Sequence, residues 1–151
     1  MENTNKHSDL SYLREMAGND NEIIREMLEI FIEQVPEFTN GISNSFSSQN
    51  WEEMGALAHK AKSSLRTMGM EQLGDLLETL EHLSKGNQKM YLSYKLQKGV
   101  ELNKEDLKCW NNVKNESEDD LELKIIPTLV DTFMKQFPLA VNELRQNLSE
   151  L

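Results

Sequence analysis

The sequence predicts an all-α protein: an antiparallel four-helix bundle with a short extra helix at the N-terminus and an insertion before the last helix. Only three prolines and seven glycines occur in 151 residues. Along most of the chain, apolar residues recur at intervals of three or four, the spacing of an amphipathic helix. Because each apolar stripe has to be buried and short turns join successive helices, this pattern favours an antiparallel bundle.

The first two helices are predicted from apolar spacing and from residues that begin helices. The first spans residues 9–17, with Leu10 and Leu13 on one face. The second begins at Asn19 or Asp20, both good N-cap residues, and continues to about residue 47. Pro36 lies inside this second helix and is expected to bend it without ending it.

The third and fourth helices have clearer ends. Asn50 with Glu53 three residues later resembles a capping box, so the third helix is predicted from there to about Gly69. The fourth is predicted over 70–84, where leucines form the apolar stripe, and Gly86 is expected to close it.

The last helix is predicted over 119–149, with Pro127 and Pro138 as bends. Together with the segment 8–84 it would complete the core of the bundle. The length suits one domain, so residues 1–151 are predicted to form a single domain.

The segment 85–118 does not fit the bundle pattern and is interpreted as an insertion. Its first part, MYLSYKLQKG, could be helix or strand, and NKEDLKCWNNVK resembles a short helix. The pair Cys109 and Trp110 could anchor the insertion onto the bundle. A polar, acidic run, NESEDDLE, leads into the last helix.

Composition narrows the class of protein. The chain lacks an apolar run of the roughly 20 residues that a membrane span needs, and its polar N-terminus does not resemble a secretory signal. The net charge of −10 disfavours nucleic acid as a partner. A lone cysteine, Cys109, cannot form an internal disulfide. We therefore expect a cytoplasmic protein, monomeric, without a membrane or nucleic-acid partner.

Two segments depart from the acidic average. Residues 85–114 hold seven lysines against three acids, a net charge of about +4. Residues 54–70 contain Lys60, Lys62 and Arg66 and no acid. This second segment is a basic island, and it surrounds His59.

Helical geometry places His59 on the face of the third helix that is opposite the apolar stripe. Lys62, Arg66, Gly55 and Ser63 all fall within about 60° of it around the helix axis. The two cations would repel a protonated ring, which favours the neutral, nucleophilic imidazole. The same cations could pair with the oxygens of a phosphoryl group on that ring. Gly55 and Ser63 are small and would let a partner approach.

The stretch around His59 resembles the signature of histidine-containing phosphotransfer (HPt) domains. The matching positions are a small residue before the histidine, a lysine three on, a glycine or serine four on, and an apolar-glycine pair at nine and ten. These are Ala58, His59, Lys62, Ser63, Met68 and Gly69. Ala61 departs from the pattern, since a larger aliphatic residue is usual there.

The resemblance implies a mechanism in which His59 accepts a phosphoryl group from an aspartate of a receiver domain and passes it to another receiver. It implies receiver domains of response regulators or hybrid histidine kinases as partners, and no cofactor. We expect the partner to bind over Lys60, Lys62, Ser63 and Arg66, beside Gly55, with apolar residues of the first two helices completing the surface. The basic segment 85–114 offers a competing positive surface that could bind the partner instead.

Two other functions remain open. A helical adaptor could keep the fold and dock proteins without phosphotransfer, although it would need neither His59 nor Lys62. The phospho-accepting part of a histidine kinase is also conceivable, but the chain is too short to include an ATP-binding domain. Glu78 and His82 have a spacing that can bind metal, but two ligands make no site, so no metal is expected.

Overall fold

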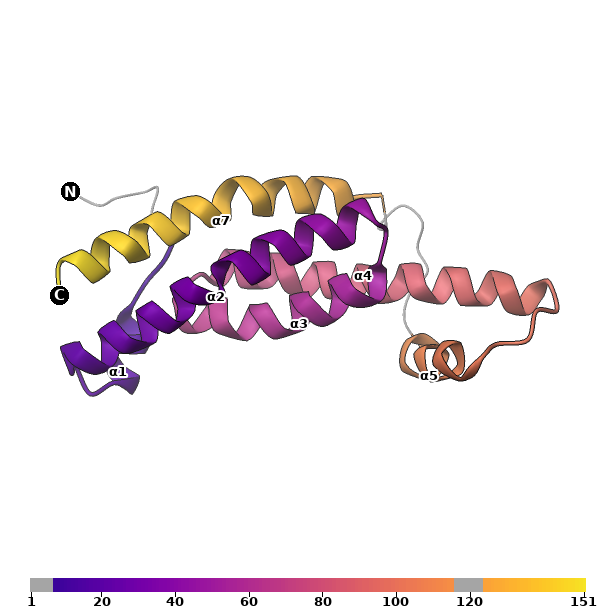
Figure 1. The fold of residues 1–151 in the computed structure, drawn as a ribbon, viewed down its shortest axis with the longest axis horizontal. Coiled ribbons are helices and arrows are strands. Elements are labelled where there is room, and N and C mark those ends of the chain that lie inside the picture. The colour runs from indigo at the N-terminus through magenta and orange to yellow at the C-terminus, as the bar shows by residue number, and fades with distance from the viewer. Residues whose placement is uncertain (1–6, 116–123) are drawn as a thin grey trace.

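The computed structural model describes residues 7–115 and 124–151, and within them the chain is helical without any strand (Figure 1). The predicted all-α class is thus confirmed. The described helices, in chain order, are α1 (Ser11–Met16), α2 (Asn21–Ser47), α3 (Trp51–Thr67), α4 (Glu71–Gln97), α5 (Lys104–Val113) and α7 (Ile126–Ser149).

Four of these helices, α2, α3, the first half of α4 and α7, lie side by side and alternate in direction (Figure 1). One apolar core lies between them, and α1 packs at one end of it. At its centre, the Phe133 and Phe137 rings stack with centroids 4.9 Å apart, and Phe31 meets Phe137 edge-on at 6.3 Å. The stripes seen in the sequence are therefore buried against one another, as amphipathic helices require.

The beginning of α3 and its end follow from the local sequence. Asn50 caps the helix, because its side-chain oxygen accepts the backbone N–H of Glu53 at 3.1 Å. The helix ends where Gly69 adopts a left-handed φ of +73°. A Cβ at Gly69 would overlap the backbone of Asp9, so this position needs glycine for conformation and for space.

Helix α4 is longer than the sequence analysis predicts, because Gly86 does not end it. Gly86 is buried inside a helix that continues to Gln97. An interior glycine costs only about 1 kcal/mol relative to alanine, which the apolar contacts of the second half of α4 can offset. The true stop is Gly99, with φ +73°, where the N–H of Val100 donates to the carbonyl of Lys95 at 3.0 Å.

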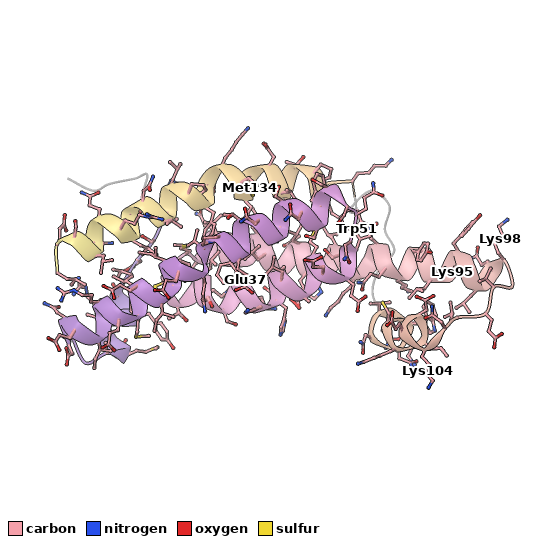
Figure 2. The ribbon with its side chains drawn as sticks, viewed as in Figure 1. Glu37, Trp51, Lys95, Lys98, Lys104 and Met134 are labelled. Atoms are coloured by element: carbon pink, nitrogen blue, oxygen red, sulfur yellow. The ribbon has the colours of Figure 1, made fainter. Side chains whose placement is uncertain are left out.

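The second half of α4 and the helix α5 together form an extension that projects from the bundle (Figure 1). Leu92 of α4 packs with Leu102 and Val113 in a small separate core. Cys109 and Trp110 pack against that core, so they fasten α5 to α4 rather than to the bundle core as expected. An ion pair at 2.9 Å links Lys95 to Asp106, and Lys98 lies at the far tip (Figure 2).

The last helix begins at Ile126, later than predicted. Of the predicted start, residues 119–123 lie outside the described part of the chain, and 124–125 form a turn. Pro127 occupies the first turn, where no backbone N–H is needed, so it begins α7 rather than bending it. Pro138 does lie inside the helix, as predicted. Among the described helices, none is both long and apolar enough to cross a membrane.

Candidate functional site

His59 lies in the middle of α3, on the outside of the bundle. Its side chain is 70% exposed, although its neighbours Ala58 and Ala61 are fully buried. The predicted division of α3 into an apolar face and a face that bears His59 is thus what the structure shows.

The ring of His59 is held by an acid that the sequence analysis did not identify. The Nδ1 atom lies 2.8 Å from Oε1 of Glu81 on α4, and the Glu81 side chain is only 5% exposed. An ionised carboxylate can only accept, so Nδ1 carries the hydrogen. In the neutral ring, Nε2 then has the free lone pair and is the atom able to act as a nucleophile.

Lys62 binds the same acid. Its Nζ lies 2.8 Å from Oε2 of Glu81 and 3.9 Å from Glu78, and its side chain is only 17% exposed. Burial raises the pKa of Glu81, but hydrogen bonds from Lys62 and His59 outweigh it, so this pKa lies below its ordinary value. Glu81 is therefore an anion that organises both side chains.

Arg66 is also paired with acids of α4. Its guanidinium contacts Asp75 at 2.9 Å and Glu78 at 3.0 Å, and these hydrogen bonds raise its pKa. The aliphatic part of Arg66 lies across Gly74, where a Cβ would approach it to 2.7 Å. The absence of a side chain at Gly74 thus lets Arg66 reach its acids.

These ion pairs correct the prediction that His59 lies in a basic island. No acid lies within that segment of the sequence, but neighbouring helices supply them: Lys60 pairs with Glu37 of α2 at 2.7 Å, and α4 provides acids for Lys62 and Arg66. The three cations are therefore paired charges rather than a free positive surface, and their repulsion of a protonated His59 is largely offset.

The small residues of the predicted site have different roles. Ser63 is exposed beside His59, as expected of a residue that a partner approaches. Gly55 is buried, and a Cβ there would meet the side chain of Ser84 at 3.5 Å. Its small size thus serves the contact between α3 and α4, and because Gly55 also lines the groove beside His59, its part in binding a partner stays a prediction. Gly69 has the structural role described above.

A groove of about 790 Å³ runs from His59 to the extension. Three helices line it, α3, α4 and α5. The residues are Glu52, Gly55, Ala56, His59, Glu81, Lys85, Gln88, Glu105, Lys108, Cys109, Asn112 and Val113. Burial raises the pKa of the Cys109 thiol, with the carboxylates of Glu52 and Asp106 adding to it, so this cysteine is a poor nucleophile.

The sequence carried a signal for Glu81 that could have been used. Leu77, Glu81 and Ser84 share one face of α4 at a spacing of four and three, and all three are buried. A carboxylate on an apolar stripe has to find a partner, and the histidine and lysine of the preceding helix are the natural ones. No sequence signal indicated that α5 lines the groove, because its position depends on how the extension folds back toward the bundle.

Within residues 7–115 and 124–151, no group of three or more His, Cys, Asp and Glu side chains could hold an ion.

Comparisons with known proteins identify the family. The Hpt domain family matches residues 26–110, from α2 to α5, which is more than half of the chain. Searches among curated proteins and among solved structures gave no significant match. With an exposed histidine inside the matched segment, this chain belongs to the Hpt domain family, whose members carry phosphoryl groups in phosphorelays.

Proposed function

We propose that this protein is a phosphorelay intermediate that accepts a phosphoryl group on His59 from the aspartate of one receiver domain and passes it to another. Hpt domains typically interact with receiver domains. The observation that carries the proposal is the state of His59: an exposed ring whose Nδ1 is bound 2.8 Å from a buried carboxylate.

The chemistry follows from that hydrogen bond. The lone pair of Nε2 attacks the phosphorus of the aspartyl phosphate, an Nε2–P bond forms, and the P–O bond to the aspartate breaks. Glu81 accepts from Nδ1–H throughout and stabilises the positive charge that develops on the ring. In the second transfer, the carboxylate of the next receiver attacks phosphorus, and the Nε2–P bond breaks.

We assign Lys62 the larger supporting role and Arg66 the smaller one. Lys62 contacts the carboxylate that holds the ring, so it fixes the position of Glu81 and, through Glu81, the orientation of Nε2. Arg66 lies one turn further along α3 and is held by two acids. Lys62→Ala should therefore slow transfer and shorten the lifetime of the phosphohistidine more than Arg66→Ala does.

The surface between α2 and α3 supports docking next to His59. A cavity of about 280 Å³ there is lined by Met27, Ile30, Phe31, Gln34, Ser64, Thr67 and Met68. Ile30 is 57% exposed, so its apolar side chain is accessible to a partner at this cavity. Ser63 lies next to this apolar surface, so Ser63→Trp should block a receiver without unfolding the bundle.

We also propose that residues 1–151 form a single domain, because α1, α2, α3, α4 and α7 share one core. The cytoplasmic location and the monomeric state stay predictions.

The decisive experiment compares the wild type with His59→Gln. Incubation with a phosphorylated receiver should label the wild type with acid-labile phosphate and leave the variant unlabelled. Because His59 is exposed, the variant should keep the helical content and melting temperature of the wild type. His82→Gln, on α4, is the matched control and should be labelled normally. Label that persists on His59→Gln would overturn the assignment, and docking without any labelling of the wild type would favour an adaptor.

A further inference from the structure

The groove beside His59 has a wall that the bundle does not supply. Glu52, Ala56 and His59 line it along α3, while Lys108 and Asn112 line it from α5. Helix α5 is reached only through the extended half of α4, and its small core keeps it beside that helix. The extension therefore presents polar side chains to the same groove as the reactive ring.

A receiver that docks on His59 would cover an area large enough to include the side chains of α5 that line the groove. A stable interface covers about 800 Å² on each protein, a patch of roughly 16 Å radius. The distance from His59 to Glu52 along α3 is only about 10 Å at 1.5 Å per residue. Because Glu52 and Cys109 of α5 line the same groove, a partner centred on His59 reaches α5.

We propose that α5 belongs to the docking surface for the receiver domain, and that Lys108 and Asn112 determine which receivers His59 serves. This inference rests on the proposed function, since it concerns the partner of the same histidine.

Charge supports the proposal. An aspartyl phosphate approaches His59 as an anion, but the cations nearest to the ring are held in ion pairs by acids of the bundle. Lys108 is exposed, and no carboxylate of the described residues pairs with it. Glu52 of α3 and Glu105 of α5 line the groove as well, so the groove presents a mixed pattern of charge. Such a pattern accepts a receiver with complementary charges and repels others.

The structure offers a matched pair of variants for the test. Asn111 and Asn112 are neighbouring, exposed asparagines of α5, but only Asn112 lines the groove. A tryptophan at Asn112 would fill the groove, whereas one at Asn111 would not. Lys108 and Lys104 form a second pair, since Lys104 lies outside the groove, on the side of α5 that faces away from α4 (Figure 2).

The experiment phosphorylates the protein of residues 1–151 with phosphoramidate, a small donor that needs no docking surface. It then measures transfer to a panel of purified receiver domains. Asn112→Trp should lower kcat/KM for the preferred receiver by about tenfold or more, because a filled groove raises the dissociation rate. Lys108→Glu should lower it by about three- to tenfold at low salt. Asn111→Trp and Lys104→Glu should stay within about twofold of the wild type.

The outcomes separate the inference from the proposed function. If the wild-type phosphoprotein transfers to no receiver, the proposed function fails. If it transfers, and Asn112→Trp and Lys108→Glu transfer equally well to every receiver, docking does not extend to α5 and the inference is wrong. A loss of phosphoramidate labelling in Asn112→Trp would also overturn it, because the tryptophan would then be covering His59 itself.

Discussion

The bundle around His59 and the extension beyond it are built from the same kind of helix but hold together very differently. Within the described residues, the bundle core contains 25 buried apolar side chains, and the core of the extension contains three. Exposed aromatic side chains also occur in the extension, where Tyr91 and Tyr94 are each 59% exposed. The bundle has the apolar burial for a stable scaffold, whereas the extension depends on a few contacts.

This difference suits a site with two tasks. His59 and its acid, for which we propose the chemistry, need fixed positions, and they lie on helices of the large core. Selection of a partner, which we propose for α5, tolerates adjustment, and α5 is held by a core of only three buried side chains. Buried apolar contacts are therefore many where the chemistry is proposed and few where recognition is proposed.

The largest effect that would test this contrast is expected for Phe137→Ala. Phe137 is fully buried and contacts two other aromatic rings, so its truncation should cost about 3–5 kcal/mol of the free energy of unfolding. Urea denaturation followed by circular dichroism measures it. Leu139→Ala is the control, because Leu139 is 51% exposed and should change stability by less than about 0.5 kcal/mol. Equal effects of the two variants would mean that α7 is not part of the core.

A smaller and local effect is expected for Val113→Ala. The loss of two methyl groups from the small core should cost about 1.5 kcal/mol there, enough to open α5. Amide hydrogen exchange should accelerate over 104–113, while exchange in α3 changes little. Leu107→Ala, at a residue 48% exposed on the same helix, should leave exchange unchanged. If Val113→Ala accelerates exchange in both regions equally, the bundle and the extension unfold as one unit.

The smallest effect is a difference in acid sensitivity between the wild type and Glu81→Gln. Because the pKa of Glu81 in the folded protein lies below its ordinary value, the ionised carboxylate stabilises the fold at neutral pH. This contribution is complete above the ordinary pKa near 4.5 and is lost as the pH falls through the lowered pKa.

Between pH 6 and pH 3, the wild type should therefore lose more stability than Glu81→Gln, as measured by urea denaturation at each pH. Glu37→Gln removes an exposed partner of Lys60 and should lose stability as the wild type does. A Glu81→Gln variant with the acid sensitivity of the wild type would show that Glu81 is not the anion inferred here.

The helices of the bundle could be predicted from the sequence because their ends and their buried faces depend on residues close together in the sequence. Asn50 and Gly69 mark the ends of α3 through their own backbone preferences, and helix periodicity puts His59 opposite the buried residues. Gly86 misled the prediction, because a glycine is only a weak obstacle to a helix that has a packing partner further along. Here the partner is supplied by Leu102 and Val113, which contact Leu92.

The environment of His59 was predictable only in part. The sequence shows the cations of α3, but not that acids of α2 and α4 neutralise them. Such pairing depends on the relative rotation of the helices, which each helix taken alone does not determine. The sequence therefore predicts the exposure of His59 correctly and the charge around it wrongly.

The return of the extension toward the bundle has a consequence for how the chain assembles. The extended half of α4 carries the backbone roughly 20 Å away from Ser84 at 1.5 Å per residue, and the connection between α4 and α5 runs back toward the bundle (Figure 1). With the extension folded, roughly 12 residues connect Val113 to Ile126; without it, roughly 40 would have to be closed, at an additional entropic cost of about 1 kcal/mol. The small core of the extension thus shortens the effective connection between α4 and α7, and it favours closure of the bundle by that amount.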